Sequence, residues 1–273
     1  MHVKHIHVKL VSMITLSFKS WEDLFMKRHI PNIITCCNLV CGCIATCAAF
    51  QHHFYLALLF ILLGAVFDFF DGMTARVLGV SGRLGVELDS LADVVTFGVA
   101  PSAVLFTLFH FVHYPMFMYN HFWFALVPNF AFLVAAFSAL RLAKFNIDER
   151  QHTTFIGLPT PANALFWAAF VAGCEDYLRS PMMNIIFLFA FIVLSCWLLV
   201  CEVPMFSLKF QSYAWADNKV KYVFLALCGV ILIGSLIAGI GMGSVWLRLA
   251  RGLAGCIGLY IVMGLFTGLR RND

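Results

Sequence analysis

The residues whose chemistry is most evident are four aspartates in an otherwise apolar stretch. Asp68, Asp71, Asp89 and Asp93 all lie within residues 56–111. An ionised Asp near the centre of a bilayer costs about 2.5–3.5 kcal/mol on insertion scales, so four in one region need a cation that gathers them. Carboxylate oxygens suit Mg²⁺ and Mn²⁺, and such ions support chemistry on phosphates. The pattern therefore predicts a divalent-metal site at the edge of a membrane.

The spacing of these aspartates predicts that they meet. At about 100° per residue, Asp68 and Asp71 share one face of a helix. Ala75 falls between them on this face, and Gly72 lies on the other side of Asp68. Asp89 and Asp93 recur after four residues and form one stripe on the next helix. Two helices joined by a short turn pack antiparallel, so we expect the two acidic faces to converge.

Small residues and an arginine accompany the aspartates. Gly72, Ala75 and Gly85 leave space beside the carboxylates, which would let a nucleobase or a phosphate approach the backbone. Arg76 can donate two hydrogen bonds to phosphate oxygens. A carboxylate that is less engaged with metal can accept a proton from an incoming hydroxyl. The alternative is that the acids pair with cations such as Arg76 or Arg83 and only stabilise a bundle, but four acids on two facing stripes disfavour it.

The composition is that of an integral membrane protein. The chain has 273 residues, of which 62% are hydrophobic and 12% charged, and its mean hydropathy is +0.90. Soluble domains are nearer 45–50% apolar and about 25% charged. No basic patch with interleaved aromatics points to nucleic acid. Five of the ten cysteines crowd one predicted helix without CxxC units, which favours packing over metal binding.

The fold class that follows is all-α, a polytopic membrane helix bundle with about eight transmembrane helices. The expected spans are 31–50, 54–79, 84–111, 121–145, 158–176, 181–201, 220–241 and 246–268. From residue 26 onward, Lys and Arg gather at one set of helix ends, and only Arg179, Arg248 and Arg251 fall at the other. This bias predicts that both termini, and the turn between the second and third spans, face the cytoplasm.

The first 25 residues form a separate segment, rich in His and Lys, before a membrane domain at residues 26–273. Its apolar part is too short and too polar to span a membrane, and no small-residue cleavage site follows it. Two readings stay open. The segment is an interfacial amphipathic leader, or Met26 is the true start and the leader is an extension of the gene model.

The acidic run resembles a known family signature. From Asp68 the chain reads DFFDGMTARVLGVSGRLGVELDSLAD. This is similar to the signature of the CDP-alcohol phosphotransferases, D-x2-D-G-x2-A-R-x8-G-x3-D-x3-D, and every fixed position is filled at the right spacing. Members transfer a phosphatidyl-type group from a CDP-linked lipid to an alcohol and release CMP.

The resemblance implies a role for each of these residues. Asp68, Asp71 and Asp89 would bind two divalent cations, Mg²⁺ or Mn²⁺. Asp93 would serve as the catalytic base and could also contact the second ion. The residues expected to line the CDP pocket are Gly72, Ala75, Arg76 and Gly85.

Three further stretches resemble the integral-membrane phosphatidylserine synthases of bacteria within this family. They are PNIITCCNLVCG, ELDSLADVVTFGVAPS, and RLAKFN together with GLPTPANA, and they lie within residues 30 to 165. The resemblance implies CDP-diacylglycerol and L-serine as substrates and phosphatidylserine and CMP as products. It also implies a homodimer in the bacterial inner membrane, with its active site facing the cytoplasm.

The acceptor side is defined less sharply by the sequence. Arg141, Lys144, Asn146 and Arg83 are candidates to bind the serine carboxylate or a lipid phosphate, although the first two could be ordinary positive-inside anchors. Thr35 and Asn38 lie about one turn apart on the first span. They could complete the nucleotide pocket or form hydrogen bonds between helices.

Two rival functions stay open. One is the same reaction with glycerol 3-phosphate, inositol phosphate or choline as acceptor. Phosphorylated acceptors would need a cluster of cations, and the cations here are dispersed. The other rival is a cation transporter, because intramembrane aspartates also line ion pathways. That reading leaves Gly72, Ala75 and Arg76 unexplained.

Overall fold

The computed structural model describes most of the chain. The described residues are 27, 29–80, 82–147, 155–180, 184–205, 215–238 and 244–272. The expected leader, residues 1–25, lies outside them. The chain within these ranges is helical except for turns and two very short strands.

The elements follow one another as a series of long helices. In chain order they are a first helix (His29–Phe50), α2 (Phe54–Leu78), α3 (Arg83–Asp93), the π-helix η1 (Val94–Val99), α4 (Ala100–Phe109), the 3-10 helix η2 (Met116–Met118), α5 (His121–Leu126), the 3-10 helix η3 (Val127–Phe132), α6 (Leu133–Ile147), β1 (Phe155–Ile156), α7 (Thr160–Leu178), α8 (Ile185–Val200), β2 (Pro204–Met205), α9 (Trp215–Ala238) and α10 (Val245–Asn272). The strands β1 and β2 pair antiparallel, with Phe155 opposite Met205.

Six helical segments of the described residues are long and apolar enough to cross a membrane. They are His29–Phe50, Phe54–Leu78, Arg83–Phe109, His121–Ile147, Asn218–Ala238 and Val245–Gly268. These coincide with six of the eight expected spans and confirm a polytopic helical membrane protein. The other two expected ranges correspond to α7, which carries Glu175 and Asp176 near its end, and to α8, which has only 16 residues. Length and composition therefore identify six candidate spans among the described residues, and the count of eight stays a prediction.

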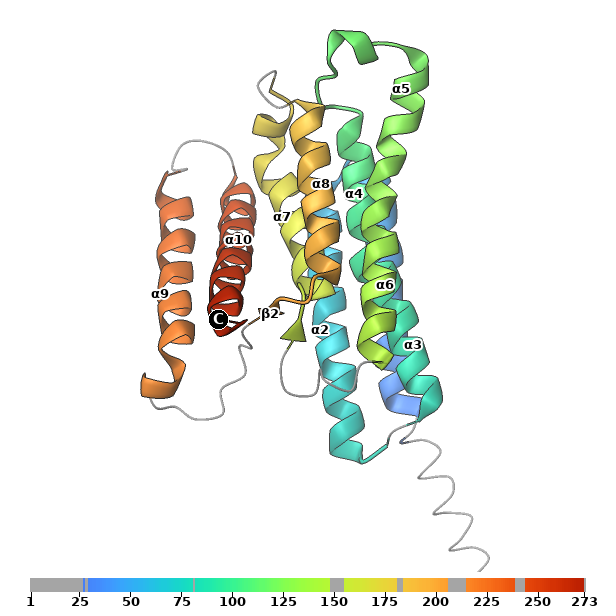
Figure 1. Cartoon of the computed structure of the whole chain (residues 1–273). Helices are drawn as coiled ribbons and strands as arrows, with labels where there is room; N and C mark the ends of the chain where they lie inside the picture. Colours follow the sequence, from blue (N-terminus) through green and yellow to red (C-terminus); the bar gives the residue numbers. More distant parts are fainter. Residues whose placement is uncertain are drawn as a thin grey trace, which may run out of the picture.

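The helices form a main bundle with a helical hairpin beside it (Figure 1). The hairpin consists of α9 and α10, and α10 lies against α7. The apolar core of the main bundle includes the fully buried side chains of Phe97, Leu105 and Trp167. By contrast, only 6% of the apolar window of α9 is buried. Such a helix needs another apolar environment, which a bilayer supplies.

A tight turn places α2 beside α3. The helix α2 ends at Gly79, whose φ of +63° lies in the left-handed region that favours glycine. The N–H of Gly79 contacts the carbonyls of Ala75 and Arg76, which would otherwise lack partners at the helix end. Gly82 then precedes the start of α3 at Arg83. This is the short connection that the sequence predicted between the two acidic helices.

Gly173 lets α7 and α10 approach closely, and we expect its replacement to destabilise the fold. An added Cβ would lie 2.5 Å from the backbone nitrogen of Arg251 and 2.9 Å from the carbonyl carbon of Ala250. Because backbone atoms cannot move aside cheaply, Gly173→Ala should cost about 1–3 kcal/mol. The measurement is thermal unfolding of the detergent-solubilised protein.

The matched control is Gly229→Ala in α9, where an added Cβ meets nothing within 4 Å. Alanine improves helix propensity at both positions, so only the clash differs between the variants. We expect Gly173→Ala to have a lower Tm than the wild type and Gly229→Ala to show no such decrease. Equal Tm values for the two variants would show that this crossing is not tight.

Candidate active site

Three of the four predicted metal ligands come together between α2 and α3. Asp68 and Asp71 project from α2 and Asp89 from α3, and one carboxylate oxygen of each lies within 4.8 Å of the others. Asp71 is buried, with 5% of its surface exposed, and the other two are half-buried. The predicted meeting of the two acidic faces is therefore present.

The three carboxylates fit a divalent cation. Asp89 Oδ1 is buried and has no hydrogen-bond partner among the described residues. An orphaned acceptor of this kind is costly unless a cation or water satisfies it. All of the donors are carboxylate oxygens, which is the set that Mg²⁺ and Mn²⁺ prefer. The cluster can thus hold such ions, which the resemblance suggested.

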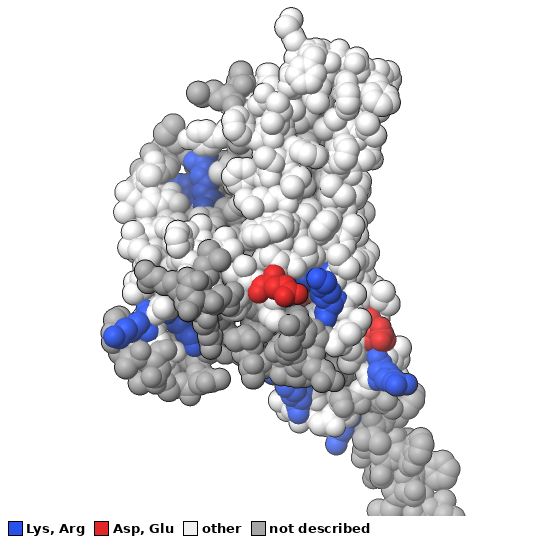
Figure 2. All heavy atoms as spheres, viewed as in Figure 1, with Lys and Arg blue, Asp and Glu red and all other residues white. Residues whose placement is uncertain are grey.

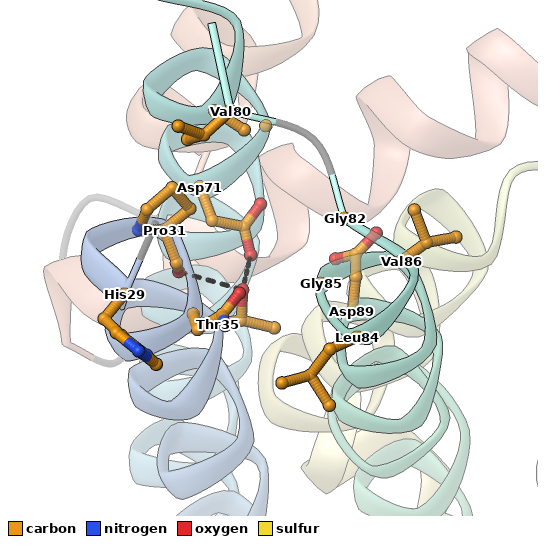
Figure 3. A pocket seen from close by; sticks show the side chains of 13 residues that line it. His29, Pro31, Thr35, Asp71, Val80, Gly82, Leu84, Gly85, Val86 and Asp89 are labelled. Atoms are coloured by element: carbon orange, nitrogen blue, oxygen red, sulfur yellow. Dashed lines mark hydrogen bonds between the residues drawn. The ribbon is translucent and has the colours of Figure 1, made fainter. Parts of the chain in front are cut away.

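The first helix supplies a third wall of the site. Thr35 Oγ1 lies 2.6 Å from Asp71 Oδ2 and 3.0 Å from the carbonyl oxygen of Pro31 (Figure 3). The hydroxyl has one proton, and the shorter contact favours donation to Asp71. In Figure 3, Asp71 and Asp89 extend from facing helices, and Thr35 reaches Asp71 from the side. Thr35 therefore orients one of the predicted metal ligands.

A cavity of about 460 Å³ opens beside the carboxylates. This volume lies within the range of roughly 300–1,000 Å³ that is usual for ligand sites. The predicted residues that line it are Thr35, Asp71, Gly72, Ala75, Gly85 and Asp89. An added Cβ at Gly72 would meet nothing within 4 Å, so this face of α2 is open. The cavity lies where the sequence predicted room for a nucleotide.

Asp93 lies one turn beyond Asp89 on α3 and, like Asp71, is buried. It is 7% exposed, and Asn38 Nδ2 donates a hydrogen bond of 3.0 Å to its Oδ1. Asn38 is fully buried and does not line the cavity, so its partner is Asp93 rather than the open pocket.

The predicted cations occupy different positions. Arg76 is exposed, and its Nε donates to the carbonyl of Gly72 at 2.9 Å. Arg83 and Lys144 are exposed and do not line the cavity. Asn146, also exposed, donates to Ser90 Oγ at 2.8 Å and so ties the end of α6 to α3.

Arg141 differs from these because it is buried. It is 7% exposed, and its Nη1 donates to Thr160 Oγ1 at 3.1 Å. Its Nε is buried without a partner, and none of the described carboxylates forms an ion pair with it. A buried guanidinium with a free donor is suited to binding an anion.

Two polar side chains of the cavity were not predicted by the sequence analysis. His29 and Asn32 line the cavity from the first turns of the first helix. Asn32 precedes Thr35 by three residues, and this helical spacing could have identified it. The predicted span began at residue 31, so it left out His29, which lies in the helix.

Charged side chains gather at the same end of the molecule. Figure 2 shows most of the visible Lys, Arg, Asp and Glu at the lower end, where α2 and α3 are joined in Figure 1. The upper part of this face is almost free of charge apart from one basic group at the left. The aspartate cluster thus belongs to the more polar end of the bundle.

The chain is similar in sequence to known proteins. Residues 28–208 match the family described as CDP-alcohol phosphatidyltransferase. The chain is 40% identical over 134 residues to a CDP-diacylglycerol--serine O-phosphatidyltransferase of Bacillus subtilis, covering 49% of this chain and 70% of that protein. A protein of the same name from Methanocaldococcus jannaschii is 32% identical over 212 residues, or 71% of this chain and 94% of its own length.

A third relative covers nearly the whole chain. The CDP-diacylglycerol--serine O-phosphatidyltransferase of Helicobacter pylori strain 26695 is 28% identical over 241 residues, covering 88% of this chain and 90% of that protein. The family match includes the first helix, α2 and α3, which carry the carboxylate cluster and its cavity. The chain therefore belongs to the CDP-alcohol phosphatidyltransferase family.

Proposed function

We propose that this protein transfers a phosphatidyl group from CDP-diacylglycerol to L-serine, giving phosphatidylserine and CMP. The observation that carries the proposal is the cluster of Asp68, Asp71 and Asp89, of which Asp71 and Asp89 line the cavity. The family match supports the reaction type. The names of the relatives support serine as the acceptor.

Each residue of the site has a part in this reaction. Asp68, Asp71 and Asp89 would hold two divalent cations, Mg²⁺ or Mn²⁺, with Asp93 within reach of the second. When bound, these ions would neutralise the pyrophosphate and the leaving CMP. Thr35 orients Asp71 through its hydroxyl.

Asp93 would take the proton of the serine hydroxyl. The serine oxygen would then bond to the phosphorus that carries diacylglycerol, while the bond from that phosphorus to the CMP oxygen breaks. Gly72, Ala75 and Gly85 leave room for the nucleotide, and Arg76 would contact its phosphates. Positioning and charge neutralisation would supply most of the rate.

For the acceptor site we propose Arg141 as the principal anion-binding residue. Its buried free donor supports binding of the serine carboxylate or of the lipid phosphate. Lys144, Asn146 and Arg83 would form the outer, water-exposed part of this region. Asn38, proposed from the sequence for the nucleotide pocket, acts on this reaction through Asp93 instead.

We further propose a membrane topology and an assembly. Residues 26–273 would form one membrane domain with eight spans, in which α7 and α8 cross the bilayer beside the six longer segments. Both termini and the active site would face the cytoplasm of a bacterial cell, at its inner membrane, and two copies would form a homodimer. The basic residues at the α2–α3 end support this orientation.

The decisive experiment is an acceptor scan. Purified protein in mixed micelles receives CDP-diacylglycerol, Mn²⁺ or Mg²⁺, and labelled serine, glycerol 3-phosphate, inositol or choline. We expect labelled lipid and CMP with serine only. Lipid product from another acceptor would reassign the substrate. In proteoliposomes, cation flux without CMP release would favour the transporter instead.

A further inference from the structure

A buried hydrogen-bonded chain lies behind the aspartate cluster. Asn38 Nδ2 donates to Asp93 Oδ1 at 3.0 Å, and Thr96 Oγ1 donates to the main-chain carbonyl of Asn38 at 3.0 Å. Asn38 and Thr96 are both 0% exposed. Neither residue lines the cavity. The chain therefore connects Asp93 to the first helix and to η1 in a part of the protein that is closed to water.

Two glycines make the slot that this chain occupies. A Cβ added at Gly42, on the first helix, would lie 2.8 Å from Thr96 Cα. A Cβ added at Gly64, on α2, would lie 2.9 Å from Asn38 Oδ1 and 2.5 Å from Thr96 Cγ2. These distances are too short for real Cβ atoms. The absence of side chains at both positions is what allows Asn38 and Thr96 to approach one another.

The local helix geometry also serves this contact. The π-helix η1 begins at Val94, directly after Asp93, and contains Thr96. A π turn is wider than an α turn, and such turns occur frequently at functional sites. Here it directs Thr96 toward the first helix while Asp93, three residues earlier, meets Asn38. Because Asp93 and Thr96 both contact Asn38, the rotation of the α3–η1 segment relative to the first helix is fixed.

We propose that Asn38 and Thr96 are positioning residues for Asp93. Asn38 holds one carboxylate oxygen by its amide N–H, and Thr96 holds the turn of the first helix that carries Asn38. The second oxygen of Asp93 is then left, in a fixed direction, to accept the proton. This inference rests on the proposed function. A misplacement of about 1 Å in an active site can cost on the order of 10²-fold in rate, which sets the effect to expect.

Replacement of each donor tests the proposal. Asn38→Leu keeps the size of the side chain but removes the amide, and Thr96→Val removes only the hydroxyl, which Thr96→Ser retains. The matched control is Ser102→Ala in α4, because the Ser102 hydroxyl is also fully buried and donates to the Gly98 carbonyl at 2.8 Å. CMP release is measured with serine, glycerol 3-phosphate, inositol and choline together, so the result does not depend on the acceptor assignment.

We expect Asn38→Leu to lower kcat about 10- to 100-fold with KM for CDP-diacylglycerol changed by less than about twofold. Thr96→Val should lower kcat about three- to tenfold, and Thr96→Ser and Ser102→Ala should stay near the wild type. If Asn38 and Thr96 only join helices, the variants will lower Tm and leave kcat intact, which overturns the positioning role. If Asn38→Leu does not fold, the comparison of kcat between Thr96→Val and Thr96→Ser tests the proposal by itself. A wild type that releases no CMP with any acceptor overturns the proposed function as well.

Discussion

Asp93→Asn should lower kcat by about 10²–10⁴-fold, the usual contribution of a general base. Asparagine has nearly the same shape and keeps a carbonyl oxygen that can accept from Asn38, but it cannot take the proton of the incoming hydroxyl. The cavity and the three clustered carboxylates remain, so binding of a CDP-lipid should persist. Turnover is followed by CMP release, and binding by the rise in Tm that CDP-diacylglycerol produces.

The control for this variant is Glu87→Gln. Glu87 lies on α3 close to Asp89 in the sequence, but it is exposed and does not line the cavity. Glu87→Gln therefore removes one carboxylate, as Asp93→Asn does, but at a residue outside the site. The activity of Glu87→Gln should equal that of the wild type. Full activity of Asp93→Asn would remove Asp93 from its role as the base. Loss of CDP-lipid binding in that variant would assign it to the binding of substrate or metal.

Asp89→Asn should strongly reduce the response to divalent cations. Asp89 Oδ1 is buried and has no hydrogen-bond partner among the described residues. A bound cation would satisfy this oxygen. Metal ions at phosphoryl oxygens contribute several kcal/mol of transition-state stabilisation. A loss of about 4 kcal/mol corresponds to a decrease of about 10³-fold in rate.

A readout apart from activity accompanies this test. A ligand present at 100 times its Kd stabilises the folded protein by about 2.7 kcal/mol. Mn²⁺ or Mg²⁺ alone should therefore raise the Tm of the wild type and of Glu87→Gln, and removal by a chelator should reverse the rise. Asp89→Asn should show a much smaller rise. An unchanged response would mean that the ion binds without Asp89.

The helical spans and the acidic cluster could be predicted because both depend on regular periods. Apolar windows of about 20 residues identify helices that cross a bilayer, and six of them match the structure closely. The convergence of Asp68, Asp71 and Asp89 follows from a helical repeat and a tight turn at Gly79. The weaker predictions were the two ranges in which length or charge departs from the pattern, α7 and α8.

Contacts between helices that are distant in sequence could not be predicted in the same way. The spacing of Thr35 and Asn38 shows that they share a face of one helix, but not which residues they meet. In the structure Thr35 reaches Asp71 on α2, while Asn38 reaches Asp93 on α3. Their partners depend on how the first helix is rotated, and this is set by close packing at Gly42 and Gly64. Similarly, burial separates Arg141 from Lys144, although both are cations in one predicted helix.

The π turn at Val94–Val99 limits how this span can gain or lose residues. Because a π turn holds more residues than an α turn, deletion of one residue there would let the segment close into a regular α-helix. The residues beyond the deletion would keep nearly the same face, because a turn of fewer residues covers the same angle, but Thr96, inside the turn, would rotate relative to Asp93. The face of α4 that carries Ala100 and Ala103, both fully buried, would still pack, whereas Thr96 would be turned away from the carbonyl of Asn38. A deletion between Asp93 and Ala100 should therefore spare the packing of α4 and break the contact of Thr96 with the first helix, whereas the loop that follows Phe109 should tolerate insertions and deletions.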